Sequence, residues 1–173
     1  MFAAIILSVL ITANIAASVW LIISKKTAAV PPRSDSTGVS AADLVPDRMS
    51  VVSGDLRITL DEGSEDYEYL LLSNNARFYN CGVSEIGADE ALSDGTIPRL
   101  VYEFDKSVTV IFPGGVPPYE EEVRVFADRI EFYCDAGAPQ IIAAYDGGAV
   151  RFFSGNDSLG VAARVKDVIE NSK

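Results

Sequence analysis

Residues 100–112, LVYEFDKSVTVIF, alternate apolar and polar side chains in two short runs. In the first run, Leu100, Tyr102 and Phe104 share one face, and the second run repeats the pattern from residue 108 to residue 112. A repeat at every second residue is typical of a strand that buries one face. The three polar residues between the runs, DKS, are few enough for a tight turn, so we expect two strands joined as a hairpin.

The same alternation recurs along the chain after residue 46. Further short runs lie at 56–60, 67–72, 77–83, 123–125, 130–134, 140–145 and 150–152. We expect turns at residues 127–128 and 146–148, and a longer loop with one helical turn at residues 87–95. Short strands joined mostly by short turns predict antiparallel sheets, so the expected fold class is mainly β, with a sandwich-like or jelly-roll-like domain.

The C-terminal segment, from about residue 158 to residue 171, changes to a helical period. Val161, Val165, Val168 and Ile169 form one apolar stripe, while charged residues point elsewhere. We expect a helix that closes the sheet by packing this stripe against it. The alternative is that the same four residues form a docking face for another protein.

The expected β domain, residues 47–173, is strongly acidic. The whole chain has a net charge of −11, and residues 1–35 contribute +2, so the remainder carries −13. Such a surface repels nucleic acid and favours basic protein partners. We therefore expect protein partners and no nucleic acid.

Residues 25–46, KKTAAVPPRSDSTGVSAADLVP, separate this domain from the N-terminus. They are rich in Ser, Thr, Ala and Pro and have no apolar period. A flexible linker of this length spans about 25 Å on average. It predicts a domain that works close to whatever holds the N-terminus.

Residues 2–23, FAAIILSVLITANIAASVWLII, contain no charged side chain. At about 1.5 Å of helical rise per residue they can cross a hydrocarbon layer of about 30 Å, so we expect a transmembrane anchor at residues 1–24 and the lipid bilayer as a partner. A cleavable signal peptide is the alternative. The apolar run continues from Val19 to Ile23 and no Lys or Arg precedes it, and both features disfavour cleavage.

The anchor carries a stripe of small residues. Ala4, Ser8, Thr12 and Ala16 recur every four residues, which allows close approach of another helix. Asn14 lies off this stripe, and in lipid its amide needs a hydrogen-bonding partner. These residues predict helix packing within the membrane.

The orientation of the anchor follows from its flanking charges. Lys25 and Lys26 come directly after the span, and only the terminal amine precedes it. The positive-inside rule then places the N-terminus outside and the C-terminal domain on the cytoplasmic side.

The chain lacks the residues of most catalytic sites. It contains no histidine, which removes the usual base of Ser and Cys hydrolases and a common ligand of zinc and iron. The Gly pairs at 114–115 and 147–148 lack the Lys-Ser/Thr of a phosphate loop, and the acidic clusters at 61–68 and 120–122 lack calcium-loop spacing. We expect no enzyme activity, cofactor or metal.

The two cysteines, Cys81 and Cys134, are too few for a four-thiolate zinc site. In a reducing compartment they would be buried thiols, whereas in an oxidising one they would be able to pair. The sequence leaves both states open.

Residues 127–132, ADRIEF, followed by residues 148–151, GAVR, resemble a strand pair of the jelly-roll proteins of lipopolysaccharide transport. One protein of that family is also held by an N-terminal helix. In that family, however, basic residues precede the anchor and the domain is periplasmic, whereas Lys25 and Lys26 follow the span here. The resemblance therefore transfers no binding residues.

Two functions fit these features. The first is a non-enzymatic, single-span structural or interaction subunit, whose acidic domain tethers or recruits proteins in a larger membrane-associated assembly. Such an assembly is a cell-envelope complex or a virion that contains a membrane. The alternative is a carrier of a lipid or other apolar ligand, with an aromatic cavity lined by Tyr69, Tyr79, Tyr102, Phe104, Phe112, Phe132 and Phe152.

Overall fold

The computed structural model describes residues 38–79, 82–88, 96–114, 122–134, 140–155 and 159–173. The chain separates into two compact units, Met1–Ser36 and Thr37–Lys173. The predicted anchor, with Ala4, Ser8, Thr12, Asn14 and Ala16, lies outside the described residues, as do Lys25 and Lys26. None of the helices in the described ranges combines the length and the hydropathy that a membrane span requires.

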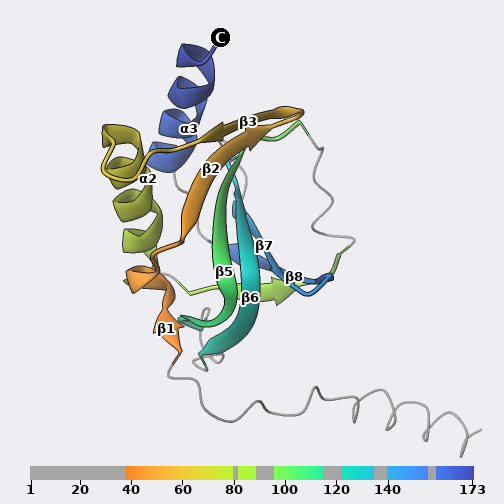
Figure 1. Cartoon of the computed structure of the whole chain (residues 1–173). Coiled ribbons are helices and arrows are strands. Elements are labelled where there is room, and N and C mark those ends of the chain that lie inside the picture. The colour runs from red at the N-terminus through yellow and green to blue at the C-terminus, as the bar shows by residue number, and fades with distance from the viewer. Residues whose placement is uncertain (1–37, 80–81, 89–95, 115–121, 135–139, 156–158) are drawn as a thin grey trace, which may run out of the picture. The chain divides into compact units, whose positions relative to one another are not determined.

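The described residues of the second unit form one sheet of eight strands, which confirms the mainly β prediction (Figure 1). The strand order is β3-β2-β5-β6-β7-β8-β4, with every neighbouring pair antiparallel, and β1 pairs in parallel with β5. The strands are β1 (Val39–Ser40), β2 (Arg48–Ser53), β3 (Leu56–Thr59), β4 (Ser84–Ile86), β5 (Arg99–Phe112), β6 (Val123–Tyr133), β7 (Gln140–Asp146) and β8 (Ala149–Gly155).

The predicted hairpin at residues 105–107 is wrong, because β5 runs unbroken through them. The pairing of β5 with β6 shifts between Glu103 and Val108, so the strand bends there instead of reversing. The predicted turn at residues 127–128 is wrong for the same reason, since these residues lie inside β6. The polar residues therefore mark an irregularity in the pairing of β5 with β6, like a β-bulge, and not the end of a strand.

The predicted strands at 67–72 and 77–83 are also wrong in the residues that are described. Residues Glu65–Ala76 form the helix α2, and Arg77–Tyr79 continue it as the short 3₁₀ helix η2. The Ser64 side chain caps α2 by accepting a hydrogen bond from the Tyr67 amide, with N···Oγ at 3.2 Å. Acidic residues in the first turn add to this start signal, because they complement the positive end of the helix dipole.

The C-terminal helix is confirmed as α3 (Leu159–Asn171), which packs against α2 and β2 (Figure 1). Val161, Val165, Val168 and Ile169 are all buried in the core of this unit. The apolar stripe is therefore covered by the chain itself, which leaves it no free area for the docking role that was the alternative.

The domain begins earlier than residue 47. β1 pairs with the second half of β5, and the 3₁₀ helix η1 (Ala41–Asp43) buries Ala41 and Ala42. At Gly38 a side chain would not fit, because a Cβ there would lie 2.7 Å from the Ile111 side chain. Residues 38–46, placed in the linker by their composition, therefore belong to the folded unit.

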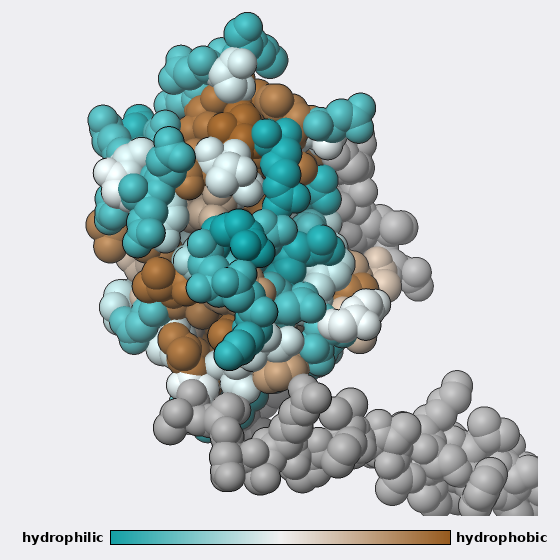
Figure 2. All heavy atoms as spheres, viewed as in Figure 1, coloured by the Kyte–Doolittle hydropathy of each residue, from teal (hydrophilic) through white to brown (hydrophobic). Residues whose placement is uncertain are grey.

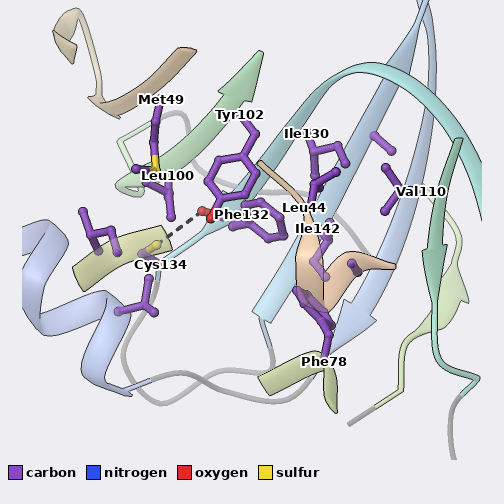
Figure 3. Close-up of a cluster of buried hydrophobic side chains, with 14 of the residues drawn as sticks. Leu44, Met49, Phe78, Leu100, Tyr102, Val110, Ile130, Phe132, Cys134 and Ile142 are labelled. Atoms are coloured by element: carbon purple, nitrogen blue, oxygen red, sulfur yellow. Dashed lines mark hydrogen bonds between the residues drawn. The ribbon is translucent and has the colours of Figure 1, made fainter. Parts of the chain in front are cut away.

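Aromatic rings fill the centre of this unit (Figure 3). The Phe78 and Phe112 rings meet edge to face with centroids 5.2 Å apart, and Tyr102 and Phe132 do so at 5.0 Å. The Phe112 ring also stacks on Phe153 from β8. This packing joins η2 to the central strands β5 and β6 and, through Phe112, to β8, so the curved sheet and η2 share one aromatic core.

Candidate interaction surface

The outward side of α2 carries large apolar side chains. Leu72 is 66% exposed, Tyr79 65% and Tyr69 44%, and Ala76 is also exposed. Their spacing of three and four residues places them along one side of the helix. Val45, 63% exposed, follows Leu44, whose carbonyl oxygen accepts a hydrogen bond from Asn75 on α2. We call Val45, Tyr69, Leu72, Ala76 and Tyr79 the α2 face.

Figure 2 shows brown, apolar surface on the left-hand side of the molecule, where the lower part of α2 and η1 lie in Figure 1. Hydrophilic side chains border it. Scattered apolar residues are normal on a protein surface, but a contiguous group on one helix indicates a place where another molecule binds.

A buried polar network holds α2 in place. The Tyr102 hydroxyl on β5 accepts a hydrogen bond from Asn74 Nδ2 and donates one to Asn75 Oδ1, both with heavy atoms 3.2 Å apart. Asn75 Nδ2 in turn donates to the carbonyl oxygen of Leu44. Burial raises the pKa of Tyr102 far above its ordinary value, so its hydroxyl stays protonated. The α2 face is thus presented on a helix with a fixed position.

The N-terminal end of α2 is fixed by α3. Arg164 on α3 forms ion pairs with Glu65, at 2.9 Å, and with Asp66, at 2.6 Å. Its guanidinium also lies over the Tyr69 ring, 5.6 Å from the centroid. These exposed contacts each contribute little to stability, but together they orient Tyr69 at one end of the α2 face.

Negative charge surrounds the same end of the helix. Glu62 precedes α2 and Glu68 lies in its first turn, and burial together with these carboxylates raises the pKa of Tyr67. No cation within the described ranges forms an ion pair with Glu62 or Glu68. At the other end, the Tyr79 hydroxyl donates a hydrogen bond to Asp43, and this bond raises its pKa. The α2 face is therefore apolar along its length and acidic at both ends.

A second cluster of charges lies on the sheet. The Glu131 carboxylate, only 6% of whose residue is exposed, pairs with Arg99 at 3.2 Å and Arg129 at 3.3 Å. The Arg129 guanidinium stacks 3.9 Å from the Tyr145 ring centroid, and burial together with Glu131 raises the pKa of Tyr145 to about 12. Two guanidinium groups share the one Glu131 carboxylate, so the cluster links the neighbouring strands β5 and β6 and keeps a net charge of +1.

The acidic residues that the sequence singled out at 61–68 spread over a turn and the first turns of α2. In the part of the chain that the structure describes, no three His, Cys, Asp or Glu side chains come together to hold a metal ion. Residues 120–121 of the second acidic cluster lie outside the described residues.

The aromatic residues of the carrier hypothesis separate into two groups. Tyr69 and Tyr79 are exposed on α2, and Phe152 is partly exposed on β8. The others pack in the core as described above, and they are Tyr102, Phe104, Phe112 and Phe132. The seven rings do not surround one space, so their arrangement gives no support to an aromatic cavity.

Cys134 is a buried free thiol next to the Tyr102 hydroxyl (Figure 3). Its sulfur donates a hydrogen bond to the Phe132 carbonyl oxygen, at 3.3 Å, and burial raises its pKa to about 11. Cys81 lies outside the described residues. In this environment Cys134 behaves as a small apolar core residue and not as a nucleophile.

The sequence contains a helix-start signal for α2, which competes with the predicted strand at residues 67–72. Ser64 followed by three carboxylates within four residues is a helix start, whereas the run YLLL carries no period that distinguishes strand from helix. Tyr69, Leu72 and Tyr79 were therefore expected inside strands or a cavity. Only their position on a capped helix makes them a surface.

Comparison of the chain with protein-family models, with curated proteins and with solved structures gives no match. The segments that resemble a strand pair of lipopolysaccharide-transport proteins lie in β6 and β8, and β7 separates these two strands in the sheet.

Proposed function

We propose that the chain is a non-enzymatic, single-span membrane protein whose acidic β domain recruits protein partners in a larger membrane-associated assembly. Residues 1–24 are the anchor, with the N-terminus outside and the domain on the cytoplasmic side. The observation that supports this proposal is the α2 face, where large apolar side chains are exposed on a helix that hydrogen bonds to the core hold in position.

The position at which the folded unit begins supports a short linker between the domain and the membrane. Because β1 begins at Val39 and Gly38 already contacts Ile111, the linker comprises only residues 25–37. A flexible segment of that length spans about 20 Å on average. A partner recruited by the domain is then held within a few tens of ångströms of the bilayer surface.

The bend in β5 supports a sandwich-like arrangement of the domain. β2 pairs with the first half of β5 and β1 with its second half, so the single sheet turns around its core. We propose that this curvature, and not a second separate sheet, produces the likeness to a β-sandwich. The result is a compact body on which α2 presents exposed apolar side chains beside the acidic turn that precedes it.

Extraction of the affinity-tagged full chain in a mild detergent tests the recruiting role. We expect the chain to sediment with stoichiometric partner proteins, at a mass well above that of one chain in a micelle. Recovery of a lone monomer from fresh membranes contradicts the proposal. A variant that lacks residues 2–23 is the control, and it should leave the membrane fraction.

Sealed vesicles test the orientation separately. Added protease should remove the C-terminal domain only when the cytoplasmic side faces outward. Cleavage in vesicles of the opposite orientation alone would place the domain on the other side, and it would leave the recruiting role to be judged by the extraction.

A further inference from the structure

We propose that the α2 face binds an amphipathic helix of another protein, with apolar residues along one side and Lys or Arg on its flanks. This inference rests on the proposed recruiting function and gives it a surface and a class of partner. It concerns only the described residues of the second unit, which all belong to one compact body.

The dimensions of the α2 face suit a helix. From Tyr69 to Tyr79 the face extends over about 15 Å, or roughly three helical turns. Its exposed residues recur at the spacing with which apolar anchors of one helix meet those of another. Two neighbouring helices pack at this spacing by placing side chains between one another, so Leu72 at the middle is the central contact.

Charge decides the type of partner. The domain carries −13, and Glu62, Glu68 and Asp43 lie around the ends of the face. Arg164, whose guanidinium lies over the Tyr69 ring, already pairs with Glu65 and Asp66. An acidic helix would be repelled, whereas Lys and Arg flanks meet carboxylates that lack a cation within the described part of the chain.

The same charges argue against a second copy of this chain on the face. A symmetric pair would bring two acidic helix starts, each part of a domain of −13, towards one another. Each copy would also need basic flanks, whereas Arg164 beside Tyr69 already pairs with Glu65 and Asp66 of its own chain. We therefore commit to a basic helix from a different protein.

The face is prepared for binding before the partner arrives. Asn74, Asn75 and Tyr102 hold α2 against the sheet, and Tyr79 is held by Asp43. Binding to a fixed helix loses less conformational entropy than ordering a loose segment. Tyrosine is enriched at interaction hot spots, and the face carries exposed Tyr69 and Tyr79 on this support.

Fluorescence anisotropy with three labelled peptides tests the inference. Each peptide has about 18 residues, a length at which a helix can form when it contacts the α2 face. The protein is the full chain in phosphatidylcholine nanodiscs, whose lipids carry no net charge. The first peptide has Leu on one side and Lys on the flanks. The second has Glu in place of Lys, and the third has the composition of the first in an order with no apolar side.

We expect the basic peptide to bind at least about tenfold more tightly than the acidic and the scrambled peptides. Its affinity should fall as salt rises from about 0.05 to about 0.5 M, because salt screens the carboxylates. Equal binding of the basic and scrambled peptides, or no binding of the basic peptide at about 1 mM, overturns the inference.

Variants locate the binding to the face. Leu72→Ser removes the central side chain and should weaken binding about tenfold, and Leu72→Lys, which keeps a good helix former, should weaken it at least as much. Val150→Ser, at an exposed apolar residue on β8, is the matched control and should bind as the native chain does. If both Leu72 variants bind normally, the peptide sits elsewhere and the inference is wrong.

Two outcomes separate this inference from the proposed function. If the native chain extracts with partners and Leu72→Ser keeps all of them, recruitment stands and the α2 face is not its site. If the native chain is a lone monomer, recruitment fails whatever the peptides do. A native dimer in sedimentation that Leu72→Ser dissociates assigns the face to a second copy and overturns the inference.

Discussion

The Tyr102 hydroxyl on β5 donates a hydrogen bond to the Asn75 side chain on α2, with the oxygen atoms 3.2 Å apart and both residues buried. Asn75 also donates to the Leu44 carbonyl oxygen. One side chain therefore ties α2 to the centre of the sheet and to the segment that enters β2. Such a link fixes the position of a helix in a way that apolar contacts alone do not, because its geometry tolerates little sliding.

Asn75→Ala should destabilise the domain by about 2 kcal/mol, because it leaves the Tyr102 hydroxyl and the Leu44 carbonyl without their buried partner. Thermal unfolding of the full chain in detergent, followed by circular dichroism, measures the change. Ser73→Ala on the same helix is the control and should stay within about 0.5 kcal/mol. Equal melting of the two variants would show that the network carries no net stability.

Val165→Ala should cost about 2 kcal/mol of unfolding free energy, because it removes methyl groups from a fully buried site on α3. Its neighbour Lys166 is exposed and pairs with Glu170 on the same helix, so Lys166→Ala should be nearly neutral. The difference between the two variants in denaturant unfolding measures how firmly α3 closes the sheet. A Val165→Ala variant as stable as the native chain would mean that α3 is not part of the core in solution.

Cys134 should resist alkylation while the domain is folded. Burial raises the pKa of its thiol from 9.0 to about 11, and the thiolate is the reactive form. In a Cys81→Ser variant at pH 8, we expect iodoacetamide to label Cys134 only after denaturant is added, as mass spectrometry reads out. Rapid labelling of the folded variant would contradict the burial.

The same shift gives Cys134 a pH dependence of known sign. Its folded pKa lies above the unfolded one, so its contribution to stability is complete below about pH 9 and is lost as pH rises towards about 11. Cys134→Ala should therefore show a flatter loss of stability over that range than the native chain.

The Glu85–Arg151 pair should control how β4 is held at low pH. Two hydrogen bonds, at 2.9 and 2.8 Å, join the residues across β4 and β8, and Arg151 lowers the pKa of Glu85. Because the folded pKa lies below the unfolded one, the contribution is present above about pH 4.5 and is lost as pH falls through the folded value. Both side chains are about half exposed, so the effect should stay below about 1 kcal/mol.

Hydrogen exchange of the β4 amides between pH 3 and pH 6, corrected for intrinsic rates, measures this change. Protection should fall at the acid end in the native chain and should be low throughout in Arg151→Gln. If the protection of the β4 amides depended neither on pH nor on Arg151, the backbone pairing of β4 with β8 would be what keeps β4 in place.

The prediction of secondary structure from the sequence is confirmed where the apolar residues fit one period, that of a helix or that of a strand, and not both. The stripe of α3 and the turn at Gly147 and Gly148 are both where the pattern placed them, and both glycines adopt positive φ, at 54° and 98°. It failed at β5 and β6, where a polar break marked a bend, and at α2, where apolar residues lie on both sides of the helix. The α2 face escaped prediction for that second reason, because a one-sided pattern is what sequence reading detects.

The residues by themselves determined a mainly β, acidic domain with a closing helix and without histidine chemistry, because period, charge and composition are local properties that no contact can change. The tertiary structure decided that Leu44, Asn75 and Tyr102 meet across 58 positions of sequence, and hence that α2 turns its Leu72 side outward. Which side of a helix is buried depends on the residues from other parts of the fold that pack against it. The stretch YEYLLL has apolar residues on both sides of the helix, so its sequence does not say which side is buried. The buried hydrogen bonds of Asn74 and Asn75 decide that Leu72 is exposed.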